Sequence, residues 1–128
     1  MKRVIIPFLA LILFVGCSPT KPGDPSVTGQ WKGSSTVYTI STNLVLNQDG
    51  EQITGSGVVS GTYNYNGAPR DFTNNVKVTG NCAYPGVSLS LSYNSGGSNY
   101  NYSYVGTFKN EKTISGQLDQ YAITLTKQ

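Results

Sequence analysis

The chain has 128 residues, 38% of them hydrophobic and 12% charged, which is enough for one small domain and too few for two. The chain has nine Lys and Arg and six Asp and Glu, but Lys2 and Arg3 belong to a segment that is expected to be removed. The mature protein is therefore nearly neutral and has no surplus of basic residues that would favour binding to nucleic acid. The absence of His excludes the commonest general base and the commonest metal ligand.

The N-terminus shows the order of features that is typical of an export signal. Lys2 and Arg3 precede an apolar run from Val4 to Val15, which stops at Gly16. A membrane-spanning helix needs about 20 apolar residues, so this run is too short to span a membrane. We therefore expect residues 1–16 to be a signal peptide that is removed during export.

The end of this segment, Phe14-Val15-Gly16-Cys17, resembles the lipobox of bacterial lipoproteins. In that family the Cys carries lipid and becomes the new N-terminus. The resemblance therefore implies a membrane anchor on Cys17 and a place in the bacterial cell envelope. No Asp follows Cys17 directly, and in this respect the chain resembles lipoproteins that are sent to the outer membrane if the organism is Gram-negative. Residues 17–26 are rich in Pro, Gly and Ser, which is typical of a flexible tether, so the folded domain is expected at 27–128.

From Val27 onward the apolar residues alternate with polar ones instead of recurring at helical spacing, and turn residues separate the alternating runs. Residues 34–42 could continue the first run or form a loop. The expected strands are Val27–Ser34, Asn43–Gln48, Glu51–Tyr65, Phe72–Thr79 with an extension to Tyr84, Val87–Tyr93, Asn99–Phe108, Thr113–Leu118 and Tyr121–Thr126. Their short connections predict an antiparallel arrangement in chain order.

A pattern of Val or Ile, then Ser or Thr, then Gly recurs with its glycine at Gly29, Gly55, Gly80 and Gly116. Glycine inside a strand marks a place where the sheet bends or another element lies close. A sheet of eight bending strands with one apolar face most simply closes on itself into a barrel, because a closed sheet has no exposed edge strand. The sequence thus predicts an all-β fold, a small up-and-down β-barrel, with a two-sheet β-sandwich as the alternative.

Gly29-Gln30-Trp31 resembles the G-x-W that opens lipocalins and their avidin-like relatives, and residues 27–128 are similar to small lipocalin-like bacterial lipoproteins of the calycin type. The resemblance implies a barrel in which Trp31 plugs one end beneath a basic side chain of the last strand, where Lys127 is available. Biotin binding is not implied, because avidin-like sites contain several Trp and Trp31 stands alone. An ordinary core position for Trp31 is the alternative to a role in ligand binding.

A row of tyrosines is the most distinctive feature of the chain. Tyr100, Tyr102 and Tyr104 share one face of their expected strand, and Tyr63 and Tyr65 repeat the spacing. The apolar ring and polar hydroxyl of Tyr suit it to binding an amphiphile or stacking on a sugar ring. The alternative is that aromatic side chains on neighbouring strands pair with one another and only stabilise the sheet. No Lys or Arg interleaves with the row, which disfavours nucleic acid. The candidate ligand-binding residues are Trp31, Tyr63, Tyr65, Tyr100, Tyr102 and Tyr104.

Catalytic chemistry finds little support in the sequence. Most carboxylates lie at expected turns. If Cys17 is lipidated, Cys82 has no cysteine with which to form a disulfide. Cys82 shares its strand face with apolar residues, so we expect its thiol to be buried and inert. We therefore expect no enzyme activity, metal or cofactor. Two function classes remain open: binding of a small hydrophobic or sugar ligand, and a structural or protein-interaction role in the envelope without a ligand pocket. The sequence does not identify a protein partner.

Overall fold

The computed structural model describes residues 23–35 and 39–128, so the expected signal peptide, Cys17 and the first part of the tether lie outside the described residues. The described residues form eight strands and no helix. The strands are β1 (Gly29–Ser34), β2 (Ile40–Asp49), β3 (Gln52–Tyr65), β4 (Ala68–Ala83), β5 (Gly86–Ser95), β6 (Ser98–Asn110), β7 (Thr113–Leu118) and β8 (Tyr121–Lys127).

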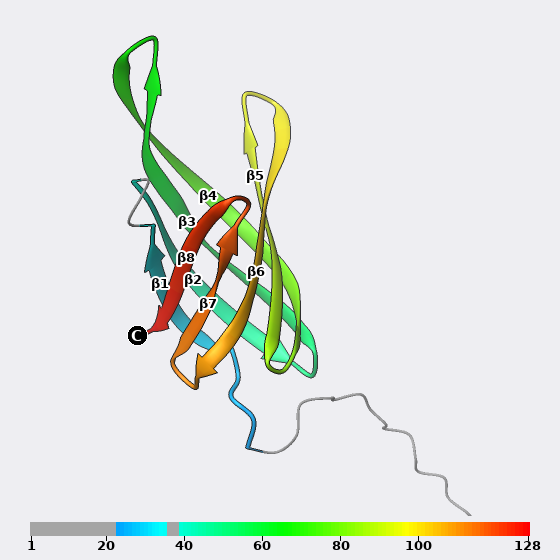
Figure 1. Ribbon diagram of the computed structural model, residues 1–128. Coiled ribbons are helices and arrows are strands. Elements are labelled where there is room, and N and C mark those ends of the chain that lie inside the picture. Colours follow the sequence, from blue (N-terminus) through cyan, green and yellow to red (C-terminus); the bar gives the residue numbers. More distant parts are fainter. Residues whose placement is uncertain (1–22, 36–38) are drawn as a thin grey trace, which may run out of the picture.

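The strands close into a single antiparallel barrel (Figure 1). Each strand pairs with the next one in the chain, and β8 returns to pair with β1, with Lys127 opposite Trp31. Closure confirms the up-and-down barrel, and the sandwich alternative is wrong. The physical reason is that β1 and β8 each have an unpaired edge until they meet, and closure satisfies the hydrogen-bonding groups of both edges.

Two hairpins are longer than the alternation predicted. The fourth strand begins at Ala68 instead of Phe72, because Asn66 and Gly67 both have positive φ angles, 52° and 82°, and form a two-residue turn that keeps β3 and β4 paired to their tips. Gly96 and Gly97, with φ angles of 62° and 86°, do the same between β5 and β6. Of the undecided segment 34–42, residues from Ile40 onward belong to β2.

The side chains that alternate inward fill the barrel with aliphatic and aromatic groups. Trp31 is 0% exposed near one end, where its ring meets Phe108 edge to face at 6.1 Å and its Nε1 donates a hydrogen bond to the carbonyl oxygen of Val27 at 2.7 Å. The Lys127 ammonium lies 5.7 Å from the centre of the Trp31 ring. This is the arrangement of Trp beneath a basic side chain that the sequence led us to expect.

The recurring glycines lie where a neighbouring strand comes close. A Cβ atom on Gly55 would approach the Val45 carbonyl oxygen to 2.2 Å, and one on Gly80 would approach the Ser88 carbonyl oxygen to 2.2 Å. Real Cβ atoms do not approach so closely, so the strongly curved sheet of this narrow barrel requires glycine there. The interpretation as sites of close approach to a neighbouring strand's backbone is confirmed for Gly55, Gly80 and Gly116, whereas a Cβ atom on Gly29 would meet only the flexible side chain of Lys127.

Cys82 is a free thiol with 0% exposure on the inward face of β4. Burial raises the pKa of the thiol, because the thiolate would lose its hydration. The expectation of a buried cysteine is confirmed.

Candidate functional site

The hairpins β3–β4 and β5–β6 project beyond the rest of the barrel at one end (Figure 1). β4 pairs with β5 only from Lys77 and Ser92 towards the other end, while each hairpin remains paired internally to its turn. The two hairpins therefore separate above these residues. A cavity of about 650 Å³ opens between them, and we call it the mouth.

Aromatic side chains dominate the lining of the mouth. They come from both projecting hairpins and from the start of β8 and are Tyr63, Phe72, Tyr93, Tyr100, Tyr102 and Tyr121. The polar groups among them are uncharged: the amides of Asn64 and Asn74 and the hydroxyls of Thr62 and Ser95. Ile40, at the start of β2, also lines the mouth. Apolar walls with a few polar groups are typical of sites for small ligands.

Paired aromatic rings form each wall, stacked on the β5–β6 side and tilted on the β3–β4 side. On the β5–β6 side, Tyr93 stacks on Tyr100 with ring centres 5.4 Å apart and on Tyr102 with centres 5.1 Å apart, because the register places Tyr93 directly opposite Tyr100. On the β3–β4 side, the rings of Tyr63 and Phe72 lie 6.2 Å apart. Tyr63 is 50% exposed and Tyr100 is 49% exposed, so both walls present aromatic surface to a ligand.

The floor of the mouth is closed. Asn74 Nδ2 donates a hydrogen bond of 3.0 Å to the hydroxyl oxygen of Tyr102, which ties β4 to β6 across the opening. Below it, Tyr104 is 2% exposed and its hydroxyl donates to the carbonyl oxygen of Ile123 at 3.0 Å. Leu91, which pairs with Tyr102, and Val76 are also buried. The mouth is therefore a shallow site above a packed core, and it does not continue into the barrel.

The structure brings three of the candidate residues together. Tyr63, Tyr100 and Tyr102 line the mouth. Tyr104 continues the same row but belongs to the core, and Trp31 lies buried near the opposite end of the barrel. Tyr65 is exposed near the tip of β3, with the Arg70 guanidinium 5.6 Å from its ring centre, and does not line the mouth.

Tyr93, Phe72 and Tyr121 also line the mouth, although they are not among the candidate residues expected from the sequence. A signal for Tyr93 was present in the sequence. A two-residue turn at Gly96 and Gly97 pairs Ser95 with Ser98 and, two steps further along the hairpin, sets Tyr93 opposite Tyr100. Tyr121 had no comparable signal, because its place in the mouth depends on how the barrel closes.

Alkaline pH is expected to destabilise the fold through two of these tyrosines. Burial raises the pKa of Tyr102 to about 12 and raises the pKa of Tyr104 well above its ordinary value. In the unfolded chain both ionise near pH 10. The folded state thus holds these protons more tightly, so its stabilisation is complete below about pH 10 and is lost as the pH rises through the folded-state pKa values.

This pH dependence can be measured by urea unfolding at a series of alkaline pH values. Tyr102→Phe removes one of the two groups, so the variant should lose less stability than the wild type between about pH 10 and pH 12. Tyr65→Phe, which changes an exposed hydroxyl, is the control. Parallel stability curves for the wild type and Tyr102→Phe would contradict the assignment.

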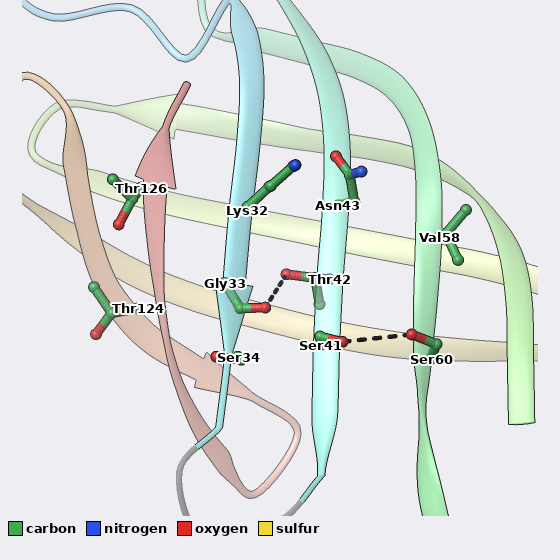
Figure 2. A pocket seen from close by; sticks show the side chains of 10 residues that line it. All are labelled: Lys32, Gly33, Ser34, Ser41, Thr42, Asn43, Val58, Ser60, Thr124 and Thr126. Atoms are coloured by element: carbon green, nitrogen blue, oxygen red, sulfur yellow. Dashed lines mark hydrogen bonds between the residues drawn. The ribbon is translucent and has the colours of Figure 1, made fainter. Parts of the chain in front are cut away.

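A second depression lies on the outer face of the barrel, over β8, β1, β2 and β3 (Figure 2). It measures about 690 Å³, and its lining is mostly hydroxyl groups with Lys32 and Asn43. Several of these hydroxyls are already engaged: Ser41 and Ser60 bond to each other at 3.4 Å, and Thr42 donates to the Gly33 carbonyl oxygen at 3.4 Å. The depression lacks aromatic walls, so the mouth is the better candidate for a ligand site.

No family model, curated protein or solved structure matches the chain. In residues 23–35 and 39–128, no helix is long and apolar enough to cross a membrane. The same residues contain no cluster of three His, Cys, Asp or Glu side chains that could hold a metal ion. A function for this chain has to be inferred from the mouth and from the N-terminal sequence.

Proposed function

We propose that this protein is an exported lipoprotein of the bacterial cell envelope whose barrel binds a small molecule or carbohydrate at the mouth. The observation that carries the proposal is the convergence of tyrosines from two separate hairpins on one open cavity. Half-exposed aromatic rings gain little from packing against their own sheet. Tyr also offers an apolar ring and a polar tip at a small entropic cost on binding, which suits it to ligand contacts.

The chemistry of the mouth supports binding without turnover. General acid–base catalysis needs a group that exchanges protons near neutral pH, and nucleophilic catalysis needs an activated thiol, amine or hydroxyl. The side chains that line the mouth offer phenols, amides and hydroxyls, and the burial-raised pKa of Tyr102 makes its phenol a weaker proton donor. We therefore assign the mouth to recognition.

The direction of the chain supports an anchored arrangement. The described chain enters β1 at the Trp31 end of the barrel, opposite the projecting hairpins (Figure 1). A lipid on Cys17, joined through the tether of residues 17–26, would hold the closed end of the barrel towards the membrane. The mouth would then face away from the membrane, accessible to a ligand in solution. If the organism is Gram-negative, the membrane concerned is the outer membrane.

The binding function is tested by two alanine substitutions, one on each wall. Tyr63→Ala and Tyr100→Ala each remove a half-exposed ring from the mouth, so each should weaken a bound ligand roughly three- to tenfold while the fold persists. Calorimetric titration follows a screen of neutral sugars and small amphiphiles against the mature chain, residues 17–128 with Cys17→Ser. Tyr65→Ala is the matched control, because its ring is equally exposed and lies outside the mouth.

If no compound in the screen responds to either substitution, and both variants change only the melting temperature, the binding proposal fails. The tyrosines would then stabilise the sheet, and the structural or protein-interaction role would replace ligand binding.

The anchor is tested separately. The wild-type protein should partition with membranes and yield an acylated N-terminal peptide, whereas Cys17→Ser should be released or remain unprocessed. Cys82→Ala is the control, because Cys82 is buried in the barrel and cannot be the lipidated residue. Mature wild-type protein with an unmodified N-terminus in the non-membrane fraction, detected by mass spectrometry, would contradict the anchor.

A further inference from the structure

The side chains that line the mouth carry no formal charge. Two charged groups of the β3–β4 hairpin are not themselves in the lining and are already engaged: Asp71 accepts a hydrogen bond of 2.9 Å from the hydroxyl of Thr62, which does line the mouth, and Arg70 lies over Tyr65. An ionic ligand would lose hydration on entering and would find no oppositely charged side chain in the lining to compensate for the loss. The mouth therefore favours an uncharged ligand.

The depth of the mouth disfavours a long acyl chain. Burial of a chain stabilises a complex by about 0.8 kcal/mol per CH₂ group, but only if the chain leaves water. Tyr104, Leu91 and Val76 close the barrel directly below the floor, so no tunnel is available to hold such a chain. A ligand of the mouth keeps part of its surface in water, and that part must be polar.

The arrangement of rings and polar groups matches a sugar. A hexose has flat faces of C–H groups, which stack on aromatic rings, and a rim of hydroxyls, which both donate and accept hydrogen bonds. In the mouth, the exposed rings of Tyr63 and Tyr100 lie beside the amide of Asn64 and the hydroxyl of Ser95, and these groups can also donate and accept. The same residues thus offer both kinds of contact that a sugar requires.

The mouth is also open between the hairpins, because β4 has no pairing with β5 above Lys77 and Ser92. A chain of sugars can therefore cross the mouth without its ends having to fit inside. Resting on the proposed binding function, we propose that the ligand of the mouth is an uncharged oligosaccharide chain that lies between the two tyrosine walls.

The test compares three classes of probe on the mature chain with Cys17→Ser. An array of neutral oligosaccharides represents the proposed class, an oligogalacturonate represents charged chains, and a dansyl-labelled undecanoic acid represents acyl amphiphiles. We expect a neutral oligosaccharide to bind with an affinity that is equal at low and high salt, because no charges pair. Tyr63→Ala and Tyr100→Ala should each weaken it at least threefold, and Tyr65→Ala should leave it within twofold.

Thermal melting establishes that each variant is folded before its affinity is measured. If Tyr100→Ala unfolds, Tyr100→Phe takes its place; this variant keeps the ring and should retain most of the stacking on the ligand. Binding of the acyl or the charged probe alone, sensitive to Tyr63→Ala and Tyr100→Ala, would overturn the oligosaccharide assignment and leave the binding function standing. Failure of every probe class to respond to these substitutions would overturn both.

Discussion

Trp31→Ala is expected to lower the free energy of unfolding by about 4 kcal/mol, the range for removing a large buried aromatic side chain. The indole is 0% exposed, packs on Phe108 and covers the closed end of the barrel. Its removal leaves a cavity and deprives the Val27 carbonyl oxygen of the hydrogen bond from Nε1. For a domain of this size the melting temperature should fall by roughly 15–25 °C, measurable by circular dichroism.

Two further variants separate the parts of this effect. Lys127→Ala removes the ammonium above the ring but leaves the indole packed, so it should cost about 1 kcal/mol or less. Trp31→Phe keeps an aromatic ring without the Nε1 donor and should fall between the other two. Because Trp31 lies near the end of the barrel that is remote from the mouth, each of these variants should bind ligand with unchanged affinity as long as it is folded. A Trp31→Ala protein that melts within a few degrees of the wild type would contradict the role of the indole as the plug.

The strands were predictable because their information is local. Val87, Leu89 and Leu91 alternate with serines, and each is buried as period two requires. Closure was predictable from glycines whose place in a strand needs a nearby backbone. The start of β4 at Ala68, earlier than the expected Phe72, follows from the Asn66-Gly67 turn, a dipeptide that is itself a strong hairpin signal.

Depth along the barrel is the property that period two does not encode. Tyr100, Tyr102 and Tyr104 share one face, yet the first is half exposed and the last is buried. The difference arises because β7 pairs with β6 only as far as Tyr104, opposite Leu118, so the neighbouring strand covers Tyr104 and ends before Tyr102. The pattern therefore identified the row of tyrosines but not which of them a ligand can reach. That depends on the lengths of adjacent strands.

Gly116→Ala is expected to destabilise the barrel by about 3 kcal/mol, at the upper end for overpacking a core. Gly116 and Gly106 face each other across β7 and β6, and the ring of Tyr104 lies over both. A Cβ atom on Gly116 would lie 2.3 Å from the Val105 carbonyl oxygen, 2.6 Å from the Gly106 Cα and 2.9 Å from Tyr104 Cζ. Backbone cannot yield as a flexible side chain can, and Tyr104 is held by its hydrogen bond to Ile123.

Gly86→Ala is the matched control for this prediction, because a Cβ atom there would meet nothing nearer than the Ala83 carbonyl oxygen at 3.5 Å. It should leave stability unchanged or raise it by up to about 1 kcal/mol, since alanine restricts the unfolded chain more than glycine does. Urea unfolding of both variants gives the comparison directly. Because Tyr104 supports the floor of the mouth from below, Gly116→Ala should also weaken ligand binding, whereas Gly86→Ala should not. Equal stabilities for the two variants would show that β6 and β7 can separate freely and that the inward glycines are not what allows the barrel to close.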